Sequence, residues 1–193
     1  MIDLGTFQGK QGCEVLLRAV NDLLREKGKV VIALAGLPGS GKTHVAKQFV
    51  RFGFGSIPRR DITVIDDNTV YTTRFWRLHW DKLPGEKKII GDFVGSASAK
   101  VIFFSNWIPG RFLDNADIMI FLTTDEEIRL ARLQRRYRHH PDKFLIQKEK
   151  RTIPLEDSFR YGKSLTLINN SREITAWLIQ WMIKRIITGI CNH

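Results

Sequence analysis

The chain has 193 residues, and its hydrophobic share of 43% and charged share of 26% are those of an ordinary globular protein. Its net charge of +11 favours polyanionic ligands, such as nucleotide phosphates, phosphorylated substrates or nucleic acid. Two widely separated cysteines exclude a disulfide framework and a zinc site, and no uncharged apolar run is long enough to span a membrane. We therefore expect a single domain over residues 1–193 in the cytoplasm, where thiols stay reduced.

The first segment with a clear pattern is a helix that we expect over residues 11–27, after a loose lead-in over residues 1–12. Its apolar face consists of side chains at helical spacing, namely Leu16, Val20, Leu23 and Leu24. Gly28 follows as a typical helix-ending residue. The apolar run 29–35 comes next, and we expect it to be a buried strand.

A glycine-rich turn follows this strand and carries the strongest motif of the chain. Gly36, Gly41, Lys42 and Thr43 match the P-loop pattern G-x-x-x-x-G-K-[ST] at every fixed position. Glycines let the backbone N–H groups form an anion nest, and the dipole of the following helix adds positive potential. Lys42 can reach the β- and γ-phosphates, and Thr43 can offer its hydroxyl group to Mg²⁺. The predicted nucleotide-binding residues are Gly36, Leu37, Pro38, Gly39, Ser40, Gly41, Lys42, Thr43 and His44.

Two carboxylates follow the next predicted strand, residues 62–65. Asp66 and Asp67 stand at its carboxyl end, where doubly wound sheets bind their ligands. A carboxylate there can deprotonate an acceptor hydroxyl, hold Mg²⁺ or hydrogen-bond a sugar. The alternative is a solvated turn, because Asp-Asp-Asn is common turn composition. With a P-loop upstream, we predict that both are catalytic and that Asp66 also binds the metal.

The segment from residue 68 to residue 94 has a weaker pattern. Residues 68–80 are expected to form one capped segment that is rich in aromatic side chains, either as part of the core or as a stacking platform for a base. Residues 88–94 are expected to form a short strand, which makes Asp92 a further candidate base at a strand end. A turn is the alternative for Asp92, because Gly91 precedes it.

Three more apolar runs, 101–104, 118–122 and 164–168, are expected to be strands, and a helix is expected over residues 172–188. Apolar strands that alternate with helices indicate an α/β fold with a doubly wound, five-stranded parallel sheet. The final helix is apolar almost all round. We expect it to pack on the sheet, and a subunit interface such as that of a homodimer is the second interpretation.

Basic side chains are concentrated between residues 129 and 151, where nine lysines and arginines stand against two acidic residues. Arg129, Arg132 and Arg136 share one face of the helix expected there, and such stacked charges destabilise a helix by themselves. They suit a bound polyphosphate, because the planar arginine fork matches phosphoryl oxygens. We predict an arginine-rich helical lid over about residues 125–160. A solvated basic face and a nucleic-acid surface are the alternatives.

Taken together, these motifs resemble those of the P-loop small-molecule kinases, most closely the uridine kinase and phosphoribulokinase group. The resemblance rests on the P-loop, the aspartate pair after the second strand, the arginine spacing and the final strand that ends in Asn169-Asn170. It implies a P-loop NTPase fold with ATP and Mg²⁺ as cofactors and with Asp66 or Asp67 as the general base. It also implies that the three arginines cover ATP and that Asn169 lies near the adenine. The third strand departs from that group, because it ends in Ser105-Asn106 where Glu-Gly is common.

The sequence thus predicts an ATP-dependent kinase that transfers the γ-phosphoryl group to a hydroxyl of a small molecule. The predicted catalytic residues are Lys42, Asp66, Asp67, Arg132 and Arg136. Arg129 and Asn169 complete the predicted nucleotide site, and Thr43 and Asp66 are the predicted metal ligands. The alternatives are a polynucleotide 5′-kinase or another nucleic-acid-linked P-loop enzyme, and a nucleotide-binding protein without catalysis.

Overall fold

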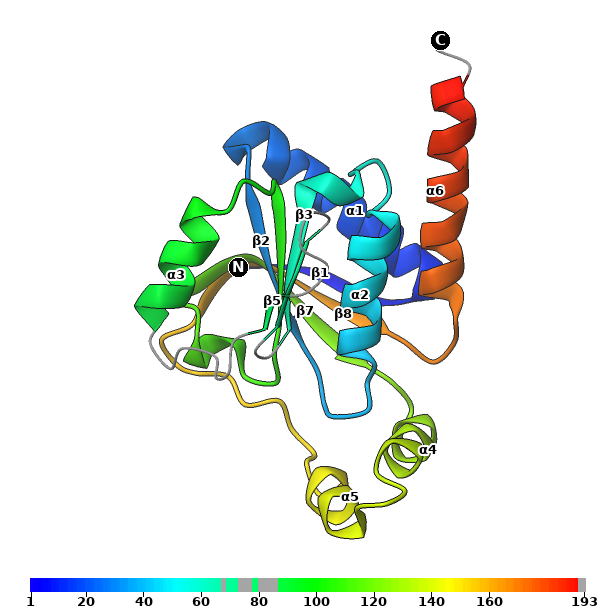
Figure 1. Cartoon of the computed structure of the whole chain (residues 1–193). Helices are drawn as coiled ribbons and strands as arrows, with labels where there is room; N and C mark the ends of the chain where they lie inside the picture. The colour runs from blue at the N-terminus through cyan, green and yellow to red at the C-terminus, as the bar shows by residue number, and fades with distance from the viewer. Residues whose placement is uncertain (67–68, 73–77, 80–86, 191–193) are drawn as a thin grey trace.

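The computed structural model of the chain describes residues 1–66, 69–72, 78–79 and 87–190. Strands and helices alternate along most of it (Figure 1). The strands are β1 (Ile2–Gln8), β2 (Val30–Ala35), β3 (Ile62–Asp66), β4 (Thr69–Tyr71), β5 (Leu78–His79), β6 (Val101–Ser105), β7 (Asn115–Thr123) and β8 (Arg160–Ile168). The helices are α1 (Gly9–Lys27), α2 (Lys42–Phe52), α3 (Lys87–Ser96), α4 (Glu126–Arg136), α5 (Pro141–Lys148) and α6 (Glu173–Ile190), with short 3₁₀ turns η1 (Arg59–Asp61) and η2 (Pro109–Arg111).

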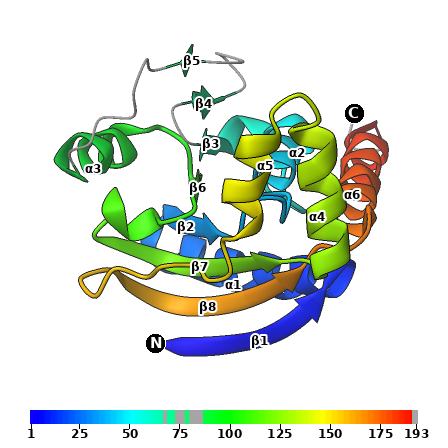
Figure 2. The same cartoon turned by 90° about the horizontal axis from the view of Figure 1, so that it is seen from below.

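All these strands form one sheet, in the order β1-β8-β7-β2-β6-β3-β4-β5 (Figure 2). The six neighbouring strands β1, β8, β7, β2, β6 and β3 pair in parallel, whereas β4 and β5 extend the sheet beyond β3 by antiparallel pairing. The five predicted strands are the central members β8, β7, β2, β6 and β3, so the α/β class with a mostly parallel sheet is confirmed. The predicted number of five strands is wrong, because the described residues contain eight.

One additional strand lies at the start of the chain, where the sequence predicted a loose lead-in. Residues Ile2–Gln8 form β1, which pairs in parallel with β8 at the edge of the sheet. Most of its side chains are exposed or half-buried, so the segment lacks the apolar run by which the buried strands were recognised. Its formation depends on backbone hydrogen bonds to β8, which is a tertiary effect.

The segment between Asp66 and β6 also differs from the prediction. Thr69–Tyr71 pairs antiparallel with β3, and Leu78–His79 pairs with Thr69–Tyr71 in turn. The residues predicted as a short strand around 88–94 form helix α3 instead, and Asp92 is exposed on it. Asp92 is therefore not a strand-end carboxylate. Ile90 and Val94 are spaced i and i+4, which places them on one face of a helix, and both side chains are buried.

Helices cover both faces of the sheet, as the doubly wound class requires. On one face the buried side chains of α1, α2 and α6 pack against alternate residues of the central strands, such as Ile32 and Leu34 of β2. On the other face α3 and the segment after η2 pack against the intervening residues, such as Ala33 and Ala35. This two-sided burial explains why β2 reads as a continuous apolar run.

The final helix packs mainly on α1 and α2. Its Trp177 lies 5.6 Å from the ring of Phe54, and Phe49 of α2 stacks on Phe103 of β6 at 4.3 Å. Contacts of this kind add about 0.5–1.5 kcal/mol each beyond the burial of apolar area. The same helix extends past the body of the protein toward the C-terminus (Figure 1). Within the described residues, no helix has the length and hydrophobicity needed to cross a membrane.

Charged groups at the amino ends of the strands are paired. Lys27 Nζ lies 2.6 Å from Asp117 Oδ1 on β7, and Asp117 Oδ2 accepts a hydrogen bond from the backbone N–H of Val31 at 2.8 Å. Lys29 Nζ donates to the carbonyl oxygens of Gly95 and Ala97 at 2.8 and 2.7 Å, at the end of α3. A cation is favoured there, because the carbonyl groups at a helix C-terminus carry partial negative charge.

Candidate nucleotide-binding site

The loop between β2 and α2 has the tight curvature that its glycines permit. Gly39 and Gly41 have φ angles of 90° and 99°, in the left-handed region that glycine enters at little cost. Gly36 makes a close approach to the neighbouring strand, because a Cβ atom there would lie 2.5 Å from the carbonyl oxygen of Leu122. Backbone geometry therefore requires glycine at the two fixed motif positions, Gly36 and Gly41, and at Gly39 between them.

The start of α2 has the properties of an anion site. Gly41 precedes the helix, and no side chain caps its first turn, whose N–H groups have no partners inside the helix. Lys42 Nζ donates to the carbonyl oxygens of Gly36 and Leu37 at 2.6 and 3.4 Å, so its ammonium group lies against the loop. The buried Ser40 Oγ has no hydrogen-bond partner among the described residues. Exposed amides, the helix dipole and an ammonium group together fit a chain of phosphates.

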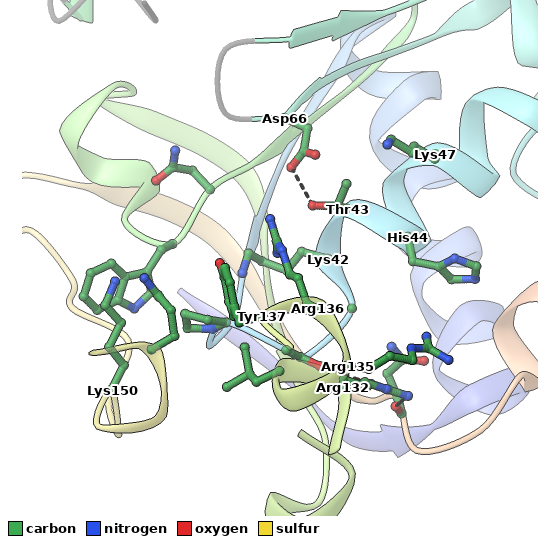
Figure 3. Close-up of a pocket in the computed structure, with 18 of the residues that line it drawn as sticks. Lys42, Thr43, His44, Lys47, Asp66, Arg132, Arg135, Arg136, Tyr137 and Lys150 are labelled. Carbon is green, nitrogen blue, oxygen red and sulfur yellow. Dashed lines mark hydrogen bonds between the residues drawn. The ribbon is translucent and has the colours of Figure 1, made fainter. Parts of the chain in front are cut away.

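Asp66 stands at the carboxyl end of β3, where two hydroxyl groups hold its carboxylate. Ser105 Oγ, at the end of β6, donates to Asp66 Oδ1 at 2.8 Å. Thr43 Oγ1 donates to the same oxygen at 3.3 Å, as Figure 3 shows. Asp66 and Ser105 are both buried, and they are paired in register across β3 and β6. The structure therefore brings together Thr43 and Asp66, the two residues predicted to bind the metal. Asp67 lies outside the described residues.

These two groups fit Mg²⁺ better than an ion that needs a protein cage. The described residues contain no cluster of three or more His, Cys, Asp or Glu side chains that could hold a metal ion. Mg²⁺ commonly takes one or two protein ligands and completes its octahedron with phosphate oxygens and water. The hydroxyl of Thr43 and the carboxylate of Asp66 beside the P-loop match that donor set.

The three predicted lid arginines divide between two environments. Arg132 and Arg136 line the cleft in front of the P-loop. The guanidinium group of Arg132 donates to the carbonyl oxygens of Ser40 at 3.2 Å and Asn169 at 3.0 Å. Burial, followed by the charge of the neighbouring Arg135, lowers the pKa of Arg132. Arg132 thus links the nucleotide loop to α4.

Arg129 does not line the cleft and is only 1% exposed. It forms a two-point ion pair with Glu126 at 2.6 and 2.9 Å. Its remaining N–H groups donate to the carbonyl oxygens of Pro38 at 3.3 Å, Gln147 at 3.3 Å and Lys148 at 3.0 Å. This placement does not support the predicted contact between Arg129 and ATP. The side chain instead braces the P-loop against α4 and the end of α5.

Asn169 follows β8 and also supports the P-loop. Its side-chain Nδ2 donates to the carbonyl oxygen of Ser40 at 2.8 Å, and the residue lines the cleft although it is largely buried. Asn170 Oδ1 accepts hydrogen bonds from Thr124 Oγ1 at 3.0 Å and from the backbone N–H of Asp125 at 2.8 Å, just before α4. The loop after β8 therefore positions both the P-loop and the first turn of α4.

His44 lies beside the P-loop, on the first turn of α2. One ring nitrogen is 3.2 Å from Thr175 Oγ1 on α6. Burial is the main cause that lowers the pKa of His44, and the charges of Arg132, Arg172 and Lys47 act in the same direction. An anion bound in front of these residues would oppose that effect.

The P-loop, β3, β6 and α4 surround a cleft with a volume of about 1150 Å³. Asp66 is the only carboxylate among the described residues that line it. The eight basic lining residues, histidine excepted, are Lys42, Lys47, Arg111, Arg132, Arg135, Arg136, Lys150 and Arg172. A cleft with one sign of charge raises the local concentration of ligands of the opposite sign.

Sequence reasoning did not identify several residues that line this cleft or hold Asp66 in it. Ser105 was recognised only as the end of a strand, and its hydrogen bond to Asp66 depends on the pairing of β3 with β6. Trp107 and Arg111 follow the same strand in a segment without a motif, and Lys47 resembles an ordinary surface lysine in the sequence, whereas Lys150 belongs to the basic cluster of the predicted lid. Only the folded arrangement places them in the cleft.

The P-loop between a parallel strand and a helix, with Thr43 and Asp66 in front of it, defines a P-loop nucleotide-binding protein. A protein-family model described as an AAA domain matches residues 32–154, well over half of the chain. The chain therefore belongs to this family of P-loop NTPase-type domains. No curated protein matches the chain significantly.

Proposed function

We propose that the protein is an ATP-dependent phosphotransferase that moves the γ-phosphoryl group to a hydroxyl of a small molecule. The observation that carries this proposal is the carboxylate of Asp66 beside the P-loop hydroxyl of Thr43, in a cleft of about 1150 Å³ that both residues line. A cleft of this size offers room for an acceptor beside a bound nucleotide.

Each group of the site has a role in this reaction. Lys42 and the loop amides hold the phosphates, and Arg132 and Arg136 stabilise the charge that develops on the transferred group. The acceptor oxygen attacks the γ-phosphorus, the bond from that phosphorus to the β–γ bridging oxygen breaks, and ADP leaves. The acceptor proton passes to a carboxylate, for which Asp66 and Asp67 are the candidates.

The hydrogen bonds of Asp66 favour a division of labour between these two aspartates. Asp66 Oδ1 already accepts from Thr43 and Ser105, which directs this carboxylate toward the metal side of the site. When bound, Mg²⁺ would neutralise charge on the β- and γ-phosphates, with Thr43 and Asp66 as its protein groups. Asp67 then remains the candidate that receives the proton.

The proposal is tested by incubating the protein with γ-labelled ATP and a panel of acceptors. The panel contains nucleosides, sugars, nucleoside monophosphates and an oligonucleotide with a 5′-hydroxyl group. We expect Mg²⁺-dependent transfer of label to at least one small molecule and loss of transfer in Lys42→Ala. Transfer to the oligonucleotide alone would favour a polynucleotide 5′-kinase.

A non-catalytic nucleotide-binding protein is the second candidate. The observation in its favour is the end of β6, where the hydroxyl of Ser105 stands in place of an acidic side chain. This candidate predicts that ATP binds with Mg²⁺ dependence while no acceptor in the panel receives label. Equilibrium binding of ATP, measured in parallel with transfer, separates the two functions.

A further inference from the structure

The cleft has a second part beyond the P-loop. Compact ligand pockets usually have volumes of about 300–1,000 Å³, and this cleft has about 1150 Å³. Its P-loop side is formed by the start of α2, the C-terminal half of α4 and the loop after β8. Its other side is formed by the segment after β6, with Trp107, Arg111 and Phe112, and by Lys150 from the end of the lid region. Figure 3 shows Lys150 on the opposite side of Lys42 from His44.

This second part adjoins the carboxyl end of β3, where Asp66 lies. Ser105, which binds Asp66, is the last residue of β6, and Trp107 and Arg111 follow within six residues. Asn106 Oδ1 accepts the backbone N–H of Ile108 at 2.9 Å, which stabilises the turn that directs this segment. An acceptor whose hydroxyl lies beside the transferring phosphate can therefore extend along the segment that carries Trp107 and Arg111.

Lys150 is held at this end of the cleft by an aromatic ring. Its ammonium group lies 3.8 Å from the ring centroid of Trp107, and the indole N–H of Trp107 donates to the carbonyl oxygen of Thr152 at 3.4 Å. A cation–π contact positions the charge without neutralising it. Within the described residues, neither Lys150 nor Arg111 forms an ion pair with a carboxylate. Both positive charges therefore line the cleft without an ion-pair partner among the residues that the structure describes.

We propose that this second part of the cleft binds a phosphate group carried by the acceptor, with Arg111 and Lys150 as its ligands. Bringing like charges together without an anion is unfavourable, and a neutral nucleoside or sugar would leave both charges unbalanced. An acceptor that carries a phosphomonoester in addition to its hydroxyl balances them. Arginine can donate two parallel N–H groups to such a phosphate, and lysine supplies a point charge.

This proposal rests on the proposed phosphotransferase function and narrows its substrate class. The acceptor carries a phosphate group before the reaction and gains one more phosphoryl group in it. The new bond joins the acceptor hydroxyl oxygen to the γ-phosphorus, whereas the phosphate bound by Arg111 and Lys150 does not react. The phosphate can belong to a small phosphorylated metabolite or to a nucleotide unit at the 5′-end of an oligonucleotide.

The test compares matched acceptors with and without a phosphate in wild type and in Arg111→Gln and Lys150→Gln. The pairs are uridine with uridine 3′-monophosphate and ribose with ribose 5-phosphate, and a 5′-hydroxyl oligonucleotide forms a separate arm. Arg18→Gln is the matched control, because Arg18 is exposed on α1 away from the cleft and loses the same charge. Circular dichroism and ATP binding verify that each variant is folded.

We expect wild type to use a phosphate-bearing acceptor with kcat/KM at least tenfold higher than its neutral partner. Arg111→Gln and Lys150→Gln should each raise KM for that acceptor at least tenfold, while Arg18→Gln leaves it unchanged. Preference for the oligonucleotide over uridine 3′-monophosphate would identify the polymer as the source of the phosphate. Equal use of neutral acceptors, or an unchanged KM in both variants, would overturn the phosphate subsite but not the kinase.

Failure of the kinase proposal gives a different result. If no acceptor receives label, equilibrium dialysis measures binding of labelled uridine 3′-monophosphate to the protein with ADP and Mg²⁺. Binding that weakens at least tenfold in Arg111→Gln would support the subsite in a protein that does not transfer phosphate. The absence of binding would overturn the subsite as well.

Discussion

The two edges of the central sheet use the same kinds of side chains for different purposes. At the amino edge, Lys27 is paired with Asp117 at 2.6 Å and Lys100 with Asp61 at 3.3 Å, while Lys29 binds the carbonyl groups that end α3. At the carboxyl edge, eight lysines and arginines line a cleft in which Asp66 is the only carboxylate described. Basic residues at the first edge stabilise the fold, whereas those at the second are arranged for a ligand.

This difference follows from where backbone groups point in a parallel α/β sheet. Helices that return to the amino edge end there, so their carbonyl groups and nearby acids attract lysines. Helices that leave the carboxyl edge begin there, so their N–H groups and added cations create positive potential that only an anion can balance. The role of a basic residue therefore depends on the negative group that it faces, which is part of the protein at the amino edge and a ligand at the carboxyl edge. Matched substitutions at the two edges test this difference.

The largest effect is expected for Lys42→Ala at the carboxyl edge. We expect kcat for phosphoryl transfer to fall on the order of 10²–10³-fold, because a fixed cation next to the developing charge is lost. The measurement is transfer from γ-labelled ATP to the best acceptor of the panel. Lys29→Ala at the amino edge is the matched control.

Lys29→Ala removes a lysine that directly precedes the P-loop strand at its other end. The substitution should lower the free energy of unfolding by about 1 kcal/mol, because Lys29 binds the carbonyl groups at the C-terminal end of α3. The value of kcat should stay within about twofold of wild type, because these contacts do not reach the cleft. If Lys29→Ala lowered kcat as strongly as Lys42→Ala, the division between the two edges would be wrong.

The next effect concerns the buried hydroxyl that holds Asp66. Ser105→Ala removes a hydrogen bond of 2.8 Å to a carboxylate, and we expect an increase of about tenfold in the Mg²⁺ concentration that gives half-maximal transfer. Asp66→Asn should have a larger effect on the same quantity. A titration with Mg²⁺ at saturating ATP measures both.

The double variant with Ser105→Ala and Asp66→Asn separates positioning from general loss of stability. If Ser105 acts through Asp66, the double variant should resemble Asp66→Asn alone. Additive losses would show that Ser105 contributes by another route. Urea unfolding of each variant reports any change in stability independently of Mg²⁺.

A smaller effect, on stability alone, is expected at Asp117. Its carboxylate accepts from Lys27 Nζ and from the backbone N–H of Val31, and Asp117 raises the pKa of Lys27 through its hydrogen bond and charge. Asp117→Asn should lower the free energy of unfolding by about 1–2 kcal/mol, because the charged acceptor is lost. ATP affinity measured at a temperature well below the unfolding transition should stay at the wild-type value. A change in affinity would connect the amino edge to the site.

The smallest effect is a pH dependence that originates at His44. Its folded-state pKa is below the ordinary 6.5, mainly through burial, so the folded protein binds fewer protons than the unfolded chain. This contribution to stability is present above pH 6.5 and decreases as the pH falls through 6.5 toward the lowered value. Urea unfolding of the nucleotide-free protein at several pH values should show a shallower acid loss in His44→Gln than in wild type. Identical slopes would exclude His44 as the group that titrates.

Much of the fold could be predicted because the buried strands and helices have strong local patterns. The run before Gly36 is apolar on both faces, and α1 ends at Gly28, whose φ of 73° is the left-handed conformation of a helix-ending glycine. The elements that were mispredicted are at the margins of the sheet. In β1 and β4 the backbone pairing to a neighbour decides the structure, and α3 contains two glycines that obscure its helical face.

The candidate site shows the same division. The P-loop residues could be found from spacing alone, because one local backbone geometry requires glycines, lysine and threonine in that order. Arg129 and Arg132 look equivalent in the sequence, since both lie on one predicted helix face. The structure buries Arg129 against Glu126 and leaves Arg132 in the cleft, a difference that depends on the packing of α5 and the loop after β8.

By itself, the sequence determined the P-loop, the α/β class and the strand-end position of Asp66, because each depends on residues that are close together in the chain. The tertiary structure decided which distant residues meet there. Parallel strands bring their carboxyl ends to one edge irrespective of their distance in sequence, so Ser105 reaches Asp66. The segment after α5 packs against the same edge, so Lys150 reaches Trp107. The charge balance of the cleft is a property of that assembled edge and of no single segment.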